Sequence, residues 1–245
     1  FINGSYQSIY PEEFQLSAEI VAEIIEKQPV YFRDQEVFGK LLQTSISLII
    51  SKQRTAATVV KALLEGTGNL LQASDQESLF NGLWAITKTL RTRSLEIYNS
   101  FFGDFEIILK HMTIEPYIIQ TITDAINETL CIGGHTTDAV VMSSLFGLMN
   151  VLLVKNASID DAVTLYVRGL VSCDSLCNEA MIGLVILCRK GFIKQEMCSQ
   201  IIGQIASCFS TGNTAYVPAA ALLLVSVAPM AKEQFSEECA SGIYA

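Results

Sequence analysis

Histidine and cysteine are the residues of this chain whose side chains could most directly support catalysis or bind a metal. There are only two histidines, His111 and His135, which limits both acid–base chemistry and metal ligation. His111 stands where we expect the last turn of a helix, and a cationic side chain there complements the helix dipole. His135 follows two glycines in an expected loop, without a local partner. Neither histidine indicates an active site.

The seven cysteines do not have the spacing of a zinc or redox motif. Cys173 and Cys177 are separated by three residues, whereas such motifs separate the pair by two. Neighbouring helices could still bring several thiols together, so a zinc cluster is an alternative to the default interpretation of buried thiols as small apolar side chains. Their odd number and apolar surroundings favour reduced thiols in an intracellular protein. The seven are Cys131, Cys173, Cys177, Cys188, Cys198, Cys208 and Cys239.

Motifs of familiar active sites are missing from the sequence. It contains no nucleophile elbow, no Walker loop and no dinucleotide-binding fingerprint. The glycine-rich stretch "EGTGN" (65–69) follows a predicted helix instead of opening one, so it lacks the context of a phosphate-binding loop. We therefore expect a protein that is not an enzyme, uses no cofactor and binds no metal.

Charge restricts the kinds of partner. The net charge is -9, and an acidic chain repels phosphate backbones, so we expect no nucleic-acid binding. Two local basic clusters could nevertheless bind an acidic segment of a protein partner if both lie on one rim, although helix ends attract such residues anyway. One cluster is Lys88, Arg91 and Arg93, and the other is Arg189, Lys190 and Lys194.

An acidic group of residues stands near the start of the chain. These glutamates are either a solvated helix face or a surface that covers a basic partner. They are Glu12, Glu13, Glu19, Glu23 and Glu26.

The hydrophobic pattern is helical almost throughout, and the strict alternation typical of strands is scarce. Ser17 is a candidate N-cap, Ser74 and Glu77 have the spacing of a capping box, and Pro116 stands in an expected first turn. The predicted helices cover residues 17–28, 34–53, 55–66, 74–91, 94–112, 114–132, 137–155, 158–173, 176–191, 193–209, 215–231 and 233–244. We therefore expect an irregular segment at 1–16 and a single helical-repeat domain at 17–245. Because the first residue is Phe1 and not Met, we expect a processed chain or a part of a longer one.

The stretch "AVVMSSLFGLMNVLLVKN" (139–156) is the most apolar part of the sequence. It is shorter than the roughly 20 residues that a membrane span needs, and Lys155 closes it. Ser143, Gly147 and Asn150 recur at helical spacing and form one narrow stripe of small or polar residues. Such a stripe on an otherwise apolar helix predicts an inner helix that neighbours cover on its other sides, with no membrane span.

Similar stripes recur along the chain. The inner-type helices begin near residues 36, 78, 117, 144, 178 and 217. Most steps are about 34 to 42 residues, with one shorter step before 144, and this is the period of helical solenoid repeats.

Three segments resemble the inner helix of a HEAT repeat or the last helix of an armadillo repeat: "LWAITKTL" (83–90), "FGLMNVLL" (146–153) and "IGLVILCR" (182–189). In armadillo repeats that helix carries a Trp and, four residues later, an Asn, which face a concave groove and hold an extended peptide. Trp84 matches the Trp, with Lys88 in the Asn position, and Asn150 matches the Asn, with Phe146 in the Trp position. The resemblance implies a right-handed α-solenoid of about five or six stacked helix pairs.

The resemblance also implies a function. We expect a non-catalytic scaffold or adaptor that holds a partner helix or extended segment along the concave inner helices, in the cytoplasm or alternatively the nucleus. The expected partner-binding residues are Trp84, Lys88, Arg91, Asn150 and Lys190. The structural alternatives are a core position for Trp84 and a hydrogen bond from Asn150 to a neighbouring loop.

Two other functional classes fit the composition. Charged residues make up only 17% of the chain and hydrophobic ones 50%, which also suits a structural subunit packed permanently inside a large complex. A membrane-associated helical bundle is the third hypothesis.

Overall fold

The computed structural model describes residues 11–68, 71–90, 95–132, 139–172, 178–210 and 217–231. Within these ranges it contains eleven α-helices, one 3-10 turn and no strand, which confirms the all-α prediction for this part of the chain. The α-helices are α2 (Pro11–Lys27), α3 (Gln35–Ile50), α4 (Ala56–Thr67), α5 (Ala73–Leu90), α6 (Leu95–His111), α7 (Pro116–Ile132), α8 (Ala139–Val154), α9 (Ala162–Ser172), α10 (Asn178–Arg189), α11 (Gln195–Ser210) and α12 (Val217–Val227), and η1 (Pro29–Phe32) is the 3-10 turn. The helix predicted at 233–244 lies outside the described residues.

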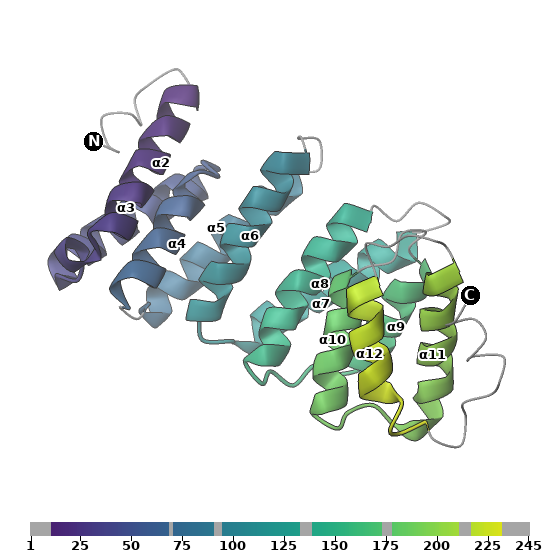
Figure 1. The fold of residues 1–245 in the computed structure, drawn as a ribbon. Coiled ribbons are helices and arrows are strands. Elements are labelled where there is room, and N and C mark those ends of the chain that lie inside the picture. The colour runs from purple at the N-terminus through teal and green to yellow at the C-terminus, as the bar shows by residue number, and fades with distance from the viewer. Residues whose placement is uncertain are drawn as a thin grey trace. The chain divides into compact units, whose positions relative to one another are not determined.

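The helices group into two compact units, of which the first ends at Thr113 and the second begins at Ile114. In the first unit, α4 packs between α2 and α6 in one row, and α3 packs against α5 in a second row (Figure 1). Contacts of α3 with α4 and of α5 with α6 join the two rows. In the second unit, α9 lies between α7 and α11, and α10 lies between α8 and α12.

This two-row packing is the arrangement that helical repeats produce, because each helix pair buries its apolar faces against the next pair. The expectation of a single domain over 17–245 stays a prediction.

Helix α2 begins earlier than the sequence pattern predicted. It starts at Pro11, six residues before the expected N-cap at Ser17. Proline is favoured in the first turn because it needs no amide partner and has a preset φ angle. Ser17 lies inside the helix, where its hydroxyl donates to the backbone carbonyl of Glu13 at 2.7 Å. The predicted irregular segment at 1–16 is therefore wrong for residues 11–16.

The helix that begins near residue 117 does not share a row with the other helices of the second unit that we predicted to be of the inner type. Helix α7 packs beside α9, whereas α8, α10 and α12 form the other row. Only one face of α7 is buried, through Ile118, Ile122 and Ile126, so its polar stripe is an ordinary solvent face. The short sequence step before 144 arises because α7 and α8 belong to different rows.

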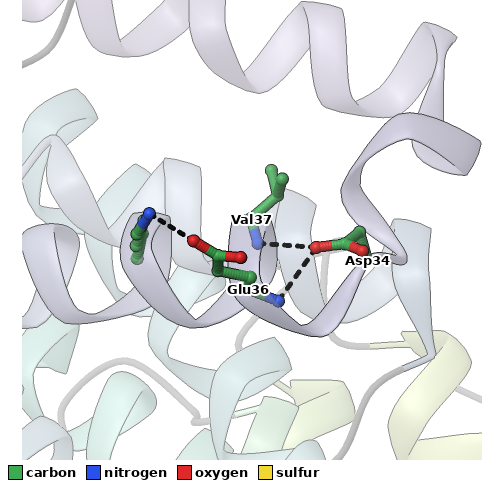
Figure 2. Close-up of polar contacts among 4 residues, drawn as sticks. Asp34, Glu36 and Val37 are labelled. Carbon is green, nitrogen blue, oxygen red and sulfur yellow. Dashed lines mark hydrogen bonds and ion pairs between the residues drawn. The ribbon is translucent and has the colours of Figure 1, made fainter.

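The start of α3 shows how local sequence fixes a helix end. Asp34 precedes the helix in an extended conformation, and its Oδ1 accepts hydrogen bonds from the backbone amides of Glu36 at 3.0 Å and Val37 at 3.1 Å (Figure 2). These bonds satisfy two amides that have no partner within the helix, as an N-cap residue does. The predicted start at Asp34 is confirmed.

Helix α8 is buried on most of its circumference, as the sequence predicted for the apolar stretch. Met142, Phe146, Met149 and Leu152 are completely buried, whereas the stripe residue Asn150 is half-buried. None of the helices in the described part of the chain combines the length and the apolar character needed to cross a bilayer.

Candidate functional site

Asn150, one of the predicted partner-binding residues, joins three helices of the second unit. Its Nδ2 donates to the backbone carbonyl of Glu179 on α10 at 2.9 Å, and its Oδ1 accepts from the Tyr166 hydroxyl on α9 at 2.7 Å. The Tyr166 ring stacks on Phe146, with ring centroids 4.9 Å apart. The hydrogen-bonding alternative for Asn150 is confirmed, with helices in place of the expected loop.

Glycine allows these helices to approach. A Cβ atom at Gly183 would lie 2.3 Å from the Tyr166 ring and 2.7 Å from Asn150 Oδ1, and one at Gly169 would lie 2.4 Å from the Phe146 ring. Contacts this short are not tolerated, so both positions need glycine for steric reasons. Ser143 adds a hydrogen bond to the Glu179 carboxylate at the other end of the same stripe.

Lys190 connects the ends of α10 and α8. Its ammonium group donates to the backbone carbonyl of Leu153 and to Asn156 Oδ1, the latter at 2.7 Å. Asn156 follows α8 with a left-handed backbone, at φ 61°. A cation that binds the last carbonyls of a helix satisfies acceptors that have no intrahelical partner and complements the dipole. Lys190 therefore fixes the chain where it leaves α8.

Next to this turn the second unit has a hollow of about 530 Å³. We call it the α8–α11 hollow, because the residues around it come from the ends of helices α8 to α11 and the turns between them. Its lining is mainly apolar, and Phe192 remains 62% exposed there. The lining residues are Leu153, Ala157, Ser158, Ile159, Asp161, Ala162, Val163, Thr164, Leu187, Phe192, Lys194, Glu196 and Met197.

The charges of the hollow have both signs. Lys194 Nζ lies 3.9 Å from Glu196 Oε1, and both side chains are largely exposed, so solvent weakens their attraction. Asp161 adds a second carboxylate among the lining residues. An apolar lining with mixed charges suits an apolar side chain carried by a polar peptide backbone better than a ligand of one strong charge.

Two of the predicted partner-binding residues, Trp84 and Lys88, lie on α5 in the first unit. Trp84 is half-buried and stacks on Phe80, with centroids 6.0 Å apart and planes inclined by 10°. Trp84 therefore does not occupy the core position of the structural alternative, because its ring packs on a residue of the same helix and is only half-buried. Lys88 is exposed one turn later, and Arg91 lies outside the described residues. A partner-binding role for Trp84 and Lys88 stays a prediction.

The other residues with possible chemistry occupy ordinary positions. His111 is the last residue of α6, as expected, and His135 lies outside the described residues. Cys188 and Cys198 are free thiols, and burial raises the pKa of both, which suppresses the reactive thiolate. Within the described ranges, no group of three His, Cys, Asp or Glu side chains is placed to hold a metal ion.

A buried carboxylate in the first unit was not among the residues predicted from the sequence. Asp104 on α6 accepts a hydrogen bond from Thr58 Oγ1 at 2.7 Å and lies 3.6 Å from Lys61 Nζ, both on α4. Burial nevertheless raises its pKa, against the lowering effect of Thr58 and Lys61. The available signal was an acid inside the aromatic stretch "SFFGDFEII", where a helix would otherwise turn an apolar face to its neighbours.

Comparison of the chain with protein-family models, curated proteins and solved structures finds no match. The resemblance to HEAT and armadillo repeats therefore rests on the repeat period and the three segments of the sequence, and it stays a prediction.

Proposed function

We propose that this protein is a non-catalytic protein-binding scaffold whose second unit receives an apolar side chain of a partner in the α8–α11 hollow. The observation that carries the proposal is the hollow itself, with an apolar lining, charges of both signs and an exposed Phe192. Apolar pockets with a few polar groups at their edge are the usual anchor points of peptide segments.

The finer architecture belongs to the same proposal. We propose a right-handed α-solenoid of five or six helix pairs, of HEAT or armadillo type, and the two-row packing within each unit supports it. The partner's helix or extended segment would lie along the row of inner helices, where Ile182 and Val154 are exposed apolar side chains. On this proposal Asn150 and Lys190 hold the helices in place and do not themselves grip the partner. The proposed location is the cytoplasm, with the nucleus as the alternative.

The proposal is tested by filling the hollow. Peptides are first selected from a random library against the intact chain, and their dissociation constants are then measured by fluorescence anisotropy. Thr164→Trp places a large ring at an exposed lining position, and Thr121→Trp places one at a half-buried position on α7 that does not line the hollow.

We expect the selected peptides to share a large apolar residue, and we expect Thr164→Trp to weaken them about tenfold or more, as displacement of one buried apolar side chain implies. Thr121→Trp should leave the affinity unchanged. Failure to select any peptide, or peptides that bind both variants equally well, would contradict the proposal.

A partner with an acidic segment is a further part of the proposal. Lys88 is exposed on α5, at the position where armadillo repeats carry the Asn, so it could contact such a segment. Lys88→Glu should then weaken the binding of acidic peptides in the selected set and leave the binding of neutral peptides unchanged. An equal loss of affinity for both kinds of peptide would contradict the electrostatic role.

A permanently packed subunit is the alternative function, and helix α12 favours it. The sequence of α12, "VPAAALLLVSV", is apolar on all sides except for Ser226, yet Leu222 and Val225 are exposed, Val225 by 71%. Apolar side chains at the surface are typical of faces that another subunit covers.

A further inference from the structure

We infer that the exposed face of α2 is a second docking surface, which accepts a partner helix whose apolar stripe is bordered by lysine or arginine. Three aliphatic side chains define this face: Leu16, Ile20 and Ile24. They are spaced four residues apart, so they follow one side of the helix. Their exposed fractions are 58%, 38% and 48%, respectively.

The opposite side of α2 already serves the core of the first unit. Phe14, Ala18, Ala22 and Ile25 are buried, and α2 packs there on α4. A Cβ atom at Gly66 of α4 would lie 3.5 Å from Ile25, an ordinary van der Waals distance, so the two helices pack closely there. The helix is thus apolar on two sides, and the core of the unit accounts for one of them. Exposed aliphatic side chains at i, i+4 and i+8 are the pattern by which a helix receives another helix.

Charge identifies the occupant. The α2 sequence contains five glutamates and one lysine. Glu23 forms an exposed ion pair with Lys27, which lowers the pKa of Glu23, and the Glu19 carboxylate accepts a hydrogen bond from Gln15 at 2.9 Å. By helical spacing, Glu19 and Glu23 lie beside the stripe, so two copies of this face would bring like charges together. A partner helix edged by cations covers the aliphatic stripe and complements the acidic border at once.

The test uses a designed probe and the intact chain. The probe is a dye-labelled helical peptide of leucine and lysine with leucines at i, i+4 and i+8. One control peptide has the same composition in scrambled order, and the other has glutamate in place of lysine. Binding is measured by fluorescence anisotropy for the wild type and for Ile20→Asp, Leu16→Gln and the pair Glu19→Lys with Glu23→Lys. Leu95→Asp is the matched control, because Leu95 is also aliphatic and 56% exposed, but it lies on α6 and not on α2.

We expect the leucine–lysine helix to bind, and we expect Ile20→Asp to weaken it about tenfold or more, since one aliphatic contact is lost and an anion replaces it. Leu16→Gln removes one apolar contact without adding charge, so it should weaken peptide binding less than Ile20→Asp does. The double Glu→Lys variant should no longer bind the lysine peptide, and it should bind the glutamate peptide. Leu95→Asp should bind as the wild type does, and circular dichroism melting should show that each variant remains folded.

Equal binding of the scrambled peptide, undiminished binding by Ile20→Asp, or no binding at all would overturn the inference. Concentration-dependent self-association that Ile20→Asp abolishes would overturn it as well, because the occupant would then be a second copy. Thr164→Trp, which fills the α8–α11 hollow, should leave this binding unchanged, so failure of one proposal is distinguishable from failure of the other.

Discussion

Asp104 is a buried carboxylate, and its burial makes the stability of the first unit depend on pH. Because its pKa is raised in the folded protein, Asp104 binds a proton more tightly when folded than when unfolded. Its favourable contribution is therefore fully present below the ordinary aspartate pKa, near 3.8, and is lost as the pH rises through the folded value.

Asp104→Asn keeps an acceptor for Thr58 and removes the buried charge. We expect the free energy of unfolding of this variant to rise relative to wild type as the pH increases from about 3 to 7, in urea titrations at each pH. Glu96→Gln, which removes an exposed carboxylate of the same helix, is the control for the loss of one charge. A difference between Asp104→Asn and wild type that stays constant with pH would contradict the assignment.

Asn150 and Tyr166 test whether a stripe residue acts in folding or in binding. Asn150→Ala removes both of its hydrogen bonds, and we expect it to lower the free energy of unfolding by about 1–3 kcal/mol. Tyr166→Phe should cost about 1 kcal/mol, and the double variant should cost less than the sum because both changes break one shared bond. Additive effects in urea titrations would show that the two side chains are not coupled.

The residues of the candidate site were only partly predictable. Asn150 could be singled out because it is a polar residue in an apolar helix, and Lys190 because it belongs to a basic cluster at a helix end. Their partners could not be, since Tyr166 and Glu179 lie 16 and 29 residues away from Asn150, and Leu153 lies 37 residues from Lys190. The α8–α11 hollow depends on where the ends of four helices meet. The spacing of apolar residues along the sequence predicts the helices but not the positions of their ends in space.

At the scale of helices, the sequence predicted well which segments of the chain form α-helices. It predicted some of the helix ends poorly. Asp34 could be identified as an N-cap because it directly precedes an apolar-periodic run. Ser17 has the same local appearance, yet it lies inside α2, because serine satisfies its hydroxyl equally well on a carbonyl four residues earlier. The row of α7 was also misjudged, because a polar stripe does not reveal whether the other sides of a helix are covered.

The N-cap of α3 gives a prediction for one helix end. Asp34→Ala removes the acceptor of two backbone amides and should lower the free energy of unfolding by about 1 kcal/mol, measured in urea. Asp34→Asn should restore most of the loss, because its side-chain oxygen can accept the same bonds. Gln35→Ala, at the next and exposed position, controls for truncation in the first turn. Equal losses for Asp34→Ala and Asp34→Asn would contradict the capping role.

Lys190 gives the corresponding prediction at the end of α8. Lys190→Met keeps the aliphatic stem and removes the cation, so we expect a loss of about 1 kcal/mol in unfolding free energy. Peptides that bind the α8–α11 hollow should also bind more weakly, because the turn after Asn156 is no longer fixed. Arg189→Met is the matched control, with a neighbouring exposed cation removed. If both variants behave alike, Lys190 contributes only its charge and not a specific contact.

At the scale of the whole molecule, the scaffold and the packed subunit differ in what the isolated chain should do in water. Both proposals must account for exposed aliphatic side chains, among them Leu16, Ile24 and Val225. Scattered exposed aliphatic residues are normal for a soluble protein, whereas a large contiguous patch promotes association. The net charge of -9 opposes self-association of the scaffold by mutual repulsion.

Size-exclusion chromatography with light scattering on the intact chain, without detergent, separates these cases. The scaffold proposal predicts a monodisperse species at the monomer mass of 26.8 kDa that stays monomeric as the concentration rises. Val225→Ser should leave its elution unchanged. Recovery only as aggregates, with Val225→Ser and Leu222→Ser increasing the monomer fraction, would favour the packed subunit, because those substitutions remove the apolar surface that a neighbouring subunit would cover. Recovery that depends on detergent would instead favour the membrane-associated bundle, and both of these outcomes would count against the scaffold.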